Sequence, residues 1–370
     1  MSAAAFSGAK SGGQAPGLYA APHGGPDAEG VPLHDFSTNS NACGPCPQAL
    51  HAVQVADATR YPDPAYTDLR AALGAFHGVA AHRIVMAGSA SEFIHRITAL
   101  AARRGGGTVA LPAHSYGDYQ HAAQAWGLPV ARGIPGAEER PLDRLHWACE
   151  PSSPLGLPDP ALQHWRAQDD TPHSATTGRD EEVLRVLDCA YVPLRLDGFR
   201  TEVPHTAWQL WTPNKALGLT GIRAAYAIAP AQVSMDLVHA LQSLAPSWPL
   251  GAHGVALLTA WVQPPVQQWL QASLLTLRGW KTTQQALCQA LGWHEVPGSL
   301  ANYFVARVSP IAVPALASAL QAVRAQGIKL RDGASFGLPG HVRLGVLAPA
   351  SQQALQQAWQ RAIQPMEQRT

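Results

Sequence analysis

The amino-acid sequence predicts an α/β protein with a mostly parallel sheet flanked by helices and a smaller C-terminal α+β domain. Its length of 370 residues is enough for two domains. As far as residue 230, short apolar segments alternate with helical patterns, which is typical of doubly wound parallel sheets. Beyond that point helical patterns dominate. We expect an extended N-terminal arm over residues 1–30, a large domain over 31–245 and a small domain over 246–370.

Apolar spacing and chain breakers predict the elements of the first part of the chain. The expected helices are 47–56, 67–76 and 93–102, and the expected strands are 84–87, 108–112, 145–149 and 183–187. Arg60–Pro64 forms an extended break, because proline drives its predecessor out of the helical region. A polar segment, Asp169–Asp180, is expected to be mobile. A strand-like run, Ala224–Ile228, closes this part.

The second part of the chain is mainly helical. The expected helices are 233–244, 250–275 with an interruption at Pro264-Pro265, 282–291, 313–326 and 351–363. The expected strands are 303–308, 328–330 and 342–346. This order predicts a separate α+β unit, with loops at the carboxyl ends of the large-domain strands sharing one crevice.

Composition excludes several classes of function. The formal net charge is +1 and only 14% of the residues are charged, so no strong field favours nucleic acid or an anionic membrane. No apolar run reaches the roughly 18 residues that span a bilayer. The first 17 residues lack the charged head and apolar centre of a signal peptide. We therefore expect a cytoplasmic protein without a metal site.

Five cysteines are an odd number in a long chain, which argues against a disulfide framework. Cys43-Gly44-Pro45-Cys46 spells a thioredoxin-type motif. However, the preceding stretch Ser37–Asn41 is polar and turn-like, and no aromatic residue stands before the first cysteine. A Gly-Pro turn with incidental thiols explains the motif better. A redox or non-catalytic binding module stays open as the competing interpretation.

The stretch from Thr212 to Arg223 carries the main chemical signal. Lys215, one of four lysines in the chain, follows two small polar residues and precedes a glycine-rich turn. Apolar neighbours remove water from an amine, and desolvation makes a lysine available for Schiff-base chemistry. A surface lysine on a loop between strands is the alternative interpretation for this residue taken alone.

Other loop ends complete the pattern. The turn Ser89-Ala90-Ser91 lies between a strand and a helix, where backbone N–H groups are free to bind phosphate. Thr212, Asn214 and Arg223 add phosphate donors. Asp188, at a strand end, could keep a pyridinium nitrogen protonated. Tyr191 could donate to the ring oxygen and Tyr116 could stack on the ring. Together they predict pyridoxal 5′-phosphate bound to Lys215 as a Schiff base.

These motifs resemble the fold-type I pyridoxal-phosphate enzymes of the class I/II aminotransferase superfamily, over roughly residues 18–365. Thr-Pro-Asn-Lys-Ala-Leu-Gly-Leu-Thr-Gly-Ile-Arg, residues 212–223, matches the lysine motif of that family. Asp188-Cys189-Ala190-Tyr191 stands where the family has Asp-Glu-Ala-Tyr. The nearest groups are histidinol-phosphate aminotransferase and threonine-phosphate decarboxylase. The resemblance implies that Lys215 is the Schiff-base lysine and that Arg223 binds the cofactor phosphate.

The resemblance also implies further contacts. Tyr61, in Arg60-Tyr61-Pro62, would reach the cofactor phosphate of the neighbouring subunit, which implies a homodimer. Arg343 would hold the substrate carboxylate, and Arg331 would face a second anionic group such as a phosphate; surface ion pairs are the alternative for both. The sequence departs from the family at Ser153, which replaces an asparagine tuning the ring oxygen. Asn214 and Cys189 replace a serine and a glutamate, so an unusual substrate or an inactive member stays open.

The expected function is a pyridoxal-phosphate-dependent aminotransferase. Its substrate would be a small amino acid or amine, with or without a phosphate, such as histidinol phosphate, and a 2-oxo acid would be its partner. The alternative is a threonine-phosphate decarboxylase, which uses the same electron sink on a different bond. The stretches His23-Gly24-Gly25, Asp35-Phe36-Ser37 and Ser247–Leu250 resemble that branch in particular.

Overall fold

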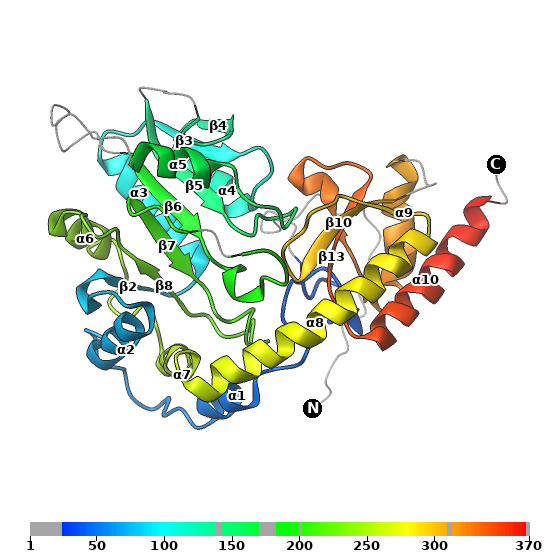
Figure 1. Ribbon diagram of the computed structural model, residues 1–370, viewed down its shortest axis with the longest axis horizontal. Helices are drawn as coiled ribbons and strands as arrows, with labels where there is room; N and C mark the ends of the chain where they lie inside the picture. Colours follow the sequence, from blue (N-terminus) through cyan, green and yellow to red (C-terminus); the bar gives the residue numbers. More distant parts are fainter. Residues whose placement is uncertain (1–23, 138–141, 170–182, 200–201, 309–312, 368–370) are drawn as a thin grey trace, which may run out of the picture.

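The computed structural model describes residues 24–137, 142–169, 183–199, 202–308 and 313–367. The main part of the expected N-terminal arm, residues 1–23, and nearly all of the polar segment expected to be mobile lie outside these ranges. The chain forms two lobes, and one long helix, α8, runs along both of them (Figure 1).

The elements have the following bounds. The strands are β1 His34–Asp35, β2 Ile84–Ala87, β3 Thr108–Pro112, β4 Val130–Gly133, β5 Asp143–Cys149, β6 Leu184–Asp188, β7 Ala207–Trp211, β8 Ala225–Ile228, β9 His294–Glu295, β10 Tyr303–Arg307, β11 Ile328–Lys329, β12 Arg331–Asp332 and β13 His341–Gly345. The α-helices are α1 Pro47–Gln54, α2 Thr67–His77, α3 Ala90–Arg103, α4 Gly117–Ala125, α5 Ala161–Asp169, α6 Met235–Gln242, α7 Ala252–Trp261, α8 Pro264–Ala290, α9 Val313–Arg324 and α10 Pro349–Glu367. The 3₁₀ helices are η1 Ala81–Arg83, η2 Val192–Leu194 and η3 Gly333–Phe336.

The larger lobe is built on a seven-stranded sheet in the order β2-β8-β7-β6-β5-β3-β4. Only β8 runs antiparallel to its neighbours, at Ala87↔Ala225 on one side and Trp211↔Tyr226 on the other. The expected mostly parallel α/β sheet is therefore confirmed. β4 and β7 were not expected. β4 is half exposed, and β7 is a tryptophan-rich segment, so neither shows a simple apolar run.

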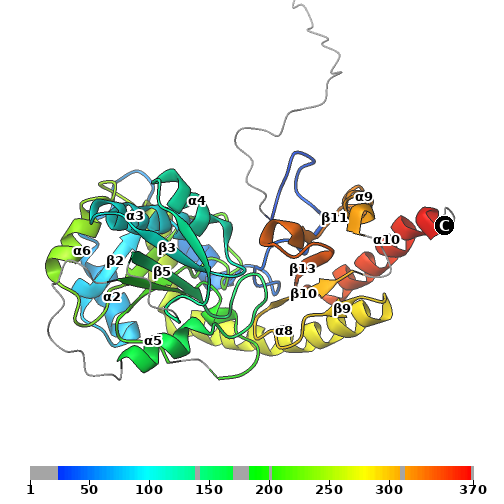
Figure 2. The ribbon, with the colours of Figure 1, turned by 90° about the horizontal axis from the view of Figure 1, so that it is seen from above.

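Helices cover both faces of this sheet, which is why its central strands are apolar on both sides. Side chains alternate between faces along each strand. In β2, Val85 packs with α3, α4 and α6, whereas Met86 packs with α1, α2, α5, α7 and α8. Figure 2 shows the two helical layers with the sheet between them.

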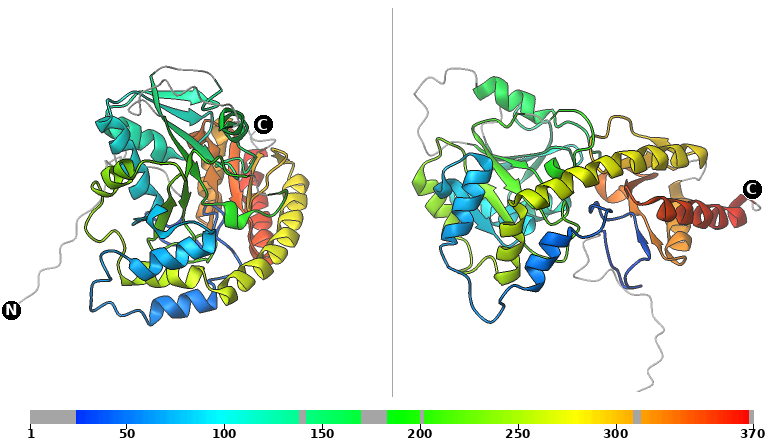
Figure 3. Two further views of the ribbon diagram at one scale, coloured as in Figure 1. Left: turned by 60° about the vertical axis from the view of Figure 1, so that its left-hand side comes forward. Right: turned by 60° about the horizontal axis from the view of Figure 1, so that its bottom comes forward.

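The smaller lobe holds a four-stranded sheet in the order β12-β13-β10-β9, packed against α9, α10 and the end of α8. Trp293 and Trp359 meet edge to face in its core, with ring centroids 4.8 Å apart. Phe36, which follows the short strand β1, also belongs to this core, and β1 pairs with β11. The segment around Phe36 thus packs with the C-terminal elements (Figure 3).

One expected break is confirmed and another is wrong. The helix expected over 250–275 is interrupted before Pro264, because α7 ends at Trp261 and α8 begins at Pro264 with the two prolines in its first turn. A separate helix was expected over 282–291, but α8 continues unbroken to Ala290. Proline fits the first turn because the N–H groups there have no intrahelical partner. The expected boundary between residues 245 and 246 stays a prediction; α7 packs in the larger core and α8 links both lobes.

None of the helices in the described part of the chain is long and apolar enough to cross a membrane.

Lys281 lies on α8 and is buried. Its burial predicts that the free energy of unfolding depends on pH. Its Nζ donates to the carbonyl oxygens of Ser299, at 2.5 Å, and Ala301, at 3.0 Å. Burial lowers its pKa to about 8 from 10.5. Between these values the unfolded chain binds more protons than the folded one, so the free energy of unfolding rises with pH. Relative to Lys281→Met, the wild-type protein should gain stability between pH 7.5 and pH 10 in urea titrations. If the difference in free energy of unfolding between the two proteins stays constant or shrinks over this range, the lowered pKa of Lys281 is contradicted.

Candidate active site

A cavity of about 520 Å³ lies between the two lobes, at the carboxyl ends of the parallel strands. Because these ends meet at one edge of the sheet, loops far apart in the sequence converge there. The cavity brings together all but one of the predicted site residues: Ala90, Ser91, Tyr116, Ser153, Asp188, Tyr191, Thr212, Asn214, Lys215, Arg223, Arg331 and Arg343 line it. Tyr61 is the exception.

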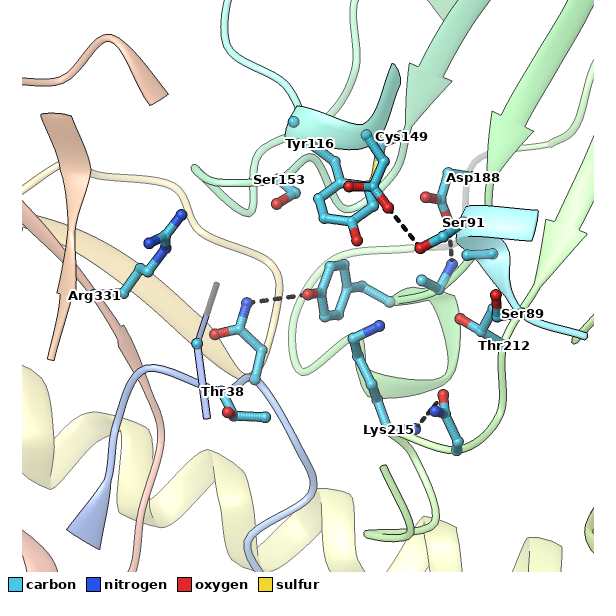
Figure 4. Close-up of a pocket in the computed structure, with 18 of the residues that line it drawn as sticks. Thr38, Ser89, Ser91, Tyr116, Cys149, Ser153, Asp188, Thr212, Lys215 and Arg331 are labelled. Carbon is cyan, nitrogen blue, oxygen red and sulfur yellow. Dashed lines mark hydrogen bonds between the residues drawn. The ribbon is translucent and has the colours of Figure 1, made fainter. Parts of the chain in front are cut away.

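Lys215 extends into the middle of this cavity (Figure 4). Its backbone is fixed on both sides: its N–H donates to Asn214 Oδ1 at 3.0 Å, and its carbonyl accepts from the N–H of Asn41 at 2.9 Å. The ammonium nitrogen lies 5.5 Å from the centre of the Tyr191 ring. The Asn214 amide also contacts the Ile222 carbonyl at 3.3 Å, so Asn214 shapes the lysine loop itself.

Asp188 ends β6 and is buried, with 5% of its surface exposed. Its two oxygens accept from the hydroxyl of Tyr119, at 2.7 Å, and the N–H of Ala190, at 2.9 Å. Burial raises the pKa of this carboxyl above its usual value, since desolvation outweighs these bonds and the attraction of Lys215. A cationic ring nitrogen beside Asp188 would offset this cost, so the carboxylate fits the pyridinium role.

The start of α3 lines the same cavity as Lys215 and is the candidate site for an anion. Ser89 caps this helix by accepting from the N–H of Glu92 at 3.1 Å, and Ala90 and Ser91 form its first turn. Free N–H groups in a first turn favour an anion. Thr212 Oγ1 is buried without a hydrogen-bond partner among the described residues, as expected of a donor whose acceptor is a ligand.

One carboxylate in the cavity does not fit a site that binds an anion. Asp118 also lines the cavity, and its Oδ2 accepts from the hydroxyl of Ser91 at 2.5 Å. Arg223 lines the same cavity and supplies a compensating positive charge. Together with the α3 N-terminus, the orphaned Thr212 hydroxyl, the buried Asp188 and the Lys215 amine, the donor set fits pyridoxal phosphate.

The opposite side of the cavity carries two buried arginines from the smaller lobe. Arg331 and Arg343 face each other across β12 and β13. Their guanidinium carbons lie 4.9 Å and 5.2 Å from the centre of the Phe336 ring. Burial, and then the charge of Arg343, lower the pKa of Arg331 to about 10. Two like charges held together in this way favour an anionic ligand between them and Lys215.

A short segment near the start of the chain supports these residues. Asp35 accepts from the Ser37 hydroxyl at 2.5 Å and the Thr38 hydroxyl at 2.6 Å. The Ser37 carbonyl accepts from Arg343 Nη2 at 2.9 Å, and its hydroxyl accepts from the N–H of Gly25 at 2.9 Å. Gly24 lines the cavity at a point where a Cβ would lie 2.2 Å from the Ser37 carbonyl oxygen, so only glycine fits.

Sequence reasoning missed several lining residues. Asn39 donates to the Tyr191 hydroxyl at 3.2 Å and so fixes the ring-oxygen donor. Tyr119, behind the lining, holds Asp188 through its hydroxyl, and no sequence pattern pointed to this bond. Thr38, Cys149, Asp118, His121 and Phe336 also line the cavity. Asn39 lies in an Asn-rich turn, which was the only available signal.

Tyr61 lies outside the cavity and is 78% exposed. Its ring stacks on Trp248 with centroids 4.4 Å apart, and the indole N–H of Trp248 donates to the Pro62 carbonyl at 3.1 Å. This aromatic pair fixes the segment on the surface of its own chain. The contact of Tyr61 with a neighbouring subunit stays a prediction.

The Cys-Gly-Pro-Cys turn supports the lysine loop. The N–H of Cys46 donates to the Leu217 carbonyl at 2.8 Å, and a Cβ on Gly218 would lie 2.5 Å from the Gly44 carbonyl oxygen. Both thiols are free. Burial raises the pKa of Cys43, which disfavours the thiolate that redox exchange needs. Among the described residues, no group of His, Cys, Asp and Glu could hold a metal ion.

A mainly parallel seven-stranded sheet with a lysine loop at its carboxyl edge defines the fold-type I pyridoxal-phosphate class. The family model for aminotransferases of class I and II matches residues 32–135 and 204–361. The chain therefore belongs to this family, and the expected membership is confirmed. The matched ranges leave out residues 136–203, which include Ser153 and Asp188.

Curated relatives and solved structures agree with this assignment. Histidinol-phosphate aminotransferase of Jannaschia sp. (strain CCS1) is 28% identical over 331 residues, which cover 85% of this chain and 87% of the relative. L-threonine-O-3-phosphate decarboxylase from Porphyromonas gingivalis has the same fold, with a TM-score of 0.72 at 18% identity over 89% of this chain and 99% of that one. Histidinol-phosphate aminotransferase from Sinorhizobium meliloti, in complex with pyridoxal-5′-phosphate, has a TM-score of 0.71 at 20% identity over 89% and 90%.

Proposed function

We propose that the protein is a pyridoxal-phosphate-dependent aminotransferase whose substrate is a small amino acid or amine, with or without a phosphate, such as histidinol phosphate. A 2-oxo acid would be the partner substrate. One observation carries the proposal: Lys215, the buried Asp188 and the Arg331–Arg343 pair line a single cavity. Aminotransferase-family membership supports the reaction type, and the arginine pair supports the anionic substrate.

The bound cofactor would supply an electron sink for the electron pair released when a bond to the substrate α-carbon breaks. In this proposal Lys215 Nζ is the attachment point and the general base that removes the α-proton. Asp188 keeps the ring nitrogen protonated, while the α3 N-terminus and Thr212 hold the phosphate. Tyr191, held by Asn39, donates to the ring oxygen. Ser153 takes the asparagine position of the family and presents a hydroxyl there.

The arginine pair would bind the anionic groups of the two substrates. Arg343 is assigned to the carboxylate or its equivalent in the partner acid, and Arg331 to the second anion. Because a charged hydrogen-bonding partner in a buried site contributes 2–5 kcal/mol, losing one should cost roughly 10² in affinity. Arg343→Gln should therefore raise KM for the 2-oxo acid about a hundredfold. Arg331→Gln should raise KM mainly for the phosphorylated substrate.

Steady-state kinetics with both substrates checks this assignment. Arg307, on β10 of the same sheet, is exposed, and Arg307→Gln is the matched control with unchanged kinetics. Equal effects of the Arg331 and Arg343 variants on both substrates would overturn the division of roles.

A second candidate, threonine-phosphate decarboxylase, is favoured by one observation. Gly24 and Ser37, from the stretches that resemble that branch, line the cavity together. His23 lies outside the described residues. In a decarboxylase the same cavity would orient the carboxylate bond rather than the α-hydrogen for cleavage.

Two incubations of the cofactor-loaded protein separate the candidates. Histidinol phosphate with 2-oxoglutarate should yield glutamate if the protein is the proposed aminotransferase. Threonine phosphate alone should yield aminopropanol phosphate and carbon dioxide if it is the decarboxylase. If only the second incubation gives a product, the first proposal is wrong. If neither does, a screen of other phosphorylated amines with 2-oxoglutarate tests whether the substrate class is wrong.

A further inference from the structure

His114 lies in the loop between β3 and α4, two residues before Tyr116, and it is not part of the cavity lining. Its Nδ1 lies 2.7 Å from the carbonyl oxygen of Phe336, which belongs to the smaller lobe and lines the cavity. A carbonyl oxygen can only accept a hydrogen bond, so Nδ1 carries the proton and donates it. His114 therefore joins the larger lobe to a wall of the candidate active site.

The larger-lobe end of this bond is held in place by Arg132, on the edge strand β4. Its Nη1 donates to the carbonyl oxygens of Pro112 and Ala113, both at 3.2 Å. The same nitrogen donates to the Ser115 hydroxyl at 3.3 Å. Because these contacts lie on both sides of His114 in the sequence, they fix its loop to the large sheet.

The smaller-lobe end of the bond is the last residue of η3. Phe336 ends this helix, and the last carbonyl groups of a helix have no partner within it. His114 supplies that partner. The next residue, Gly337, has a φ of +77°, and a Cβ there would lie 3.6 Å from His114 Nδ1, so the turn passes against the imidazole. The position of the Phe336 backbone thus depends on a residue of the larger lobe.

The Phe336 ring contacts both buried arginines of the cavity. The guanidinium carbons of Arg331 and Arg343 lie 4.9 Å and 5.2 Å from its centre, within the range of cation–π attraction. The two guanidinium groups carry like charges, so a ring that attracts both offsets part of their repulsion. The Nε of Arg343 is buried and has no hydrogen-bond partner in the described part of the chain, as expected of a donor whose acceptor is a ligand.

We propose that His114 is a positioning residue for the anionic groups of the substrates. Its bond to the Phe336 carbonyl keeps the Phe336 ring in place, and the ring keeps Arg331 and Arg343 in the arrangement that accepts an anion. The inference rests on the proposed function, in which these two arginines bind the substrate anions.

Calorimetric titration of the cofactor-loaded protein with glutarate tests this role. Glutarate has two carboxylates but neither an amine nor a keto group, so it binds without reacting. His114→Leu removes the donor and keeps a side chain of similar size, and it should raise Kd for glutarate about fivefold to tenfold, as the loss of one hydrogen bond requires. His114→Asn should stay within about twofold of the wild type, because an asparagine amide nitrogen can take the place of Nδ1.

A double-mutant cycle separates this role from a general effect on the fold. Because His114 acts through the Phe336 ring, His114→Leu should add less than about twofold to the effect of Phe336→Ala. His164 is exposed on α5 and lies outside the cavity lining, so His164→Leu is the matched control with unchanged binding. If His114→Asn binds glutarate as weakly as His114→Leu, or if the effects of His114→Leu and Phe336→Ala multiply in full, the positioning role is wrong.

Arg343→Gln in the same titration distinguishes a failure of this inference from a failure of the proposed function. If Arg343→Gln weakens glutarate and His114→Leu does not, the inference about His114 is overturned and the proposed function stands. If Arg343→Gln leaves the binding unchanged, or if the wild-type protein does not bind glutarate at millimolar concentration, the role of the arginine pair in the proposed function is wrong, and the inference fails with it.

Discussion

Lys215→Ala should lower the turnover of the cofactor-supplemented protein by at least about 10³-fold and remove its visible absorption band. Lys215 is both the attachment point of the proposed cofactor and, among the residues that the structure describes, the only lysine that lines the candidate active site. Proton transfer by a positioned side chain contributes about 10²–10⁴, and losing the covalent link adds to that. Absorbance spectra and single-turnover assays measure both effects.

The folded state should survive this change, because Lys215 is held through backbone bonds that alanine keeps. Lys329→Arg is the matched control: it keeps a cation beside Asp27 and lies outside the cavity lining, so spectrum and turnover should stay those of the wild type. A Lys215→Ala protein that retains both the band and more than a tenth of the activity would refute the assignment.

Asp188→Asn should affect activity and stability in opposite directions. Removing one member of a buried charge pair costs 3–5 kcal/mol, so kcat/KM should fall roughly 10²–10³-fold. The cofactor-free protein should become more stable at neutral pH. Burial raises the pKa of Asp188 in the folded state, so the folded chain keeps a proton that the unfolded chain has released. Stability therefore falls as pH rises through that window, and asparagine avoids the loss.

Urea titration of the cofactor-free proteins from pH 3.5 to pH 8 checks the second effect. Tyr119 can accept a hydrogen bond from the new amide, since its hydroxyl both donates and accepts. Asp197→Asn, an exposed position, should change neither property. If Asp188→Asn destabilises the cofactor-free protein at neutral pH, then burial of the Asp188 carboxylate does not lower the stability of the wild-type protein, and the expectation is wrong.

The sequence could predict the residues whose roles are written in contiguous motifs. Lys215, Arg223 and Thr212 lie within one stretch, and Asp188 and Tyr191 lie within another. Asp188 and Tyr191 follow an expected strand, and the carboxyl ends of parallel strands meet at one edge of the sheet. The lysine stretch was assigned to the same site by its motif, since the strand before it was not expected. The two arginines were assigned to the site through the resemblance of their segments to the family.

The sequence could not predict hydrogen bonds and packing contacts between distant segments. Tyr119 reaches Asp188 across 69 positions and Asn39 reaches Tyr191 across 152, so neither bond has a local signature. The continuity of α8 across residues 276–281 was missed, where Gly279 weakens the local helical signal. The pairing of β1 with β11 likewise depends on the packing of Phe36 in the smaller lobe.

The most direct test of the account is to treat the cofactor-loaded protein with sodium borohydride and map the peptides by mass spectrometry. Reduction makes a cofactor–lysine link permanent, so the label stays on the residue that held it. We expect the added mass of a reduced pyridoxyl phosphate group on the peptide containing Lys215 and on no peptide containing Lys281 or Lys329. A label on another lysine, or no label in a protein that shows the visible band, would contradict the account.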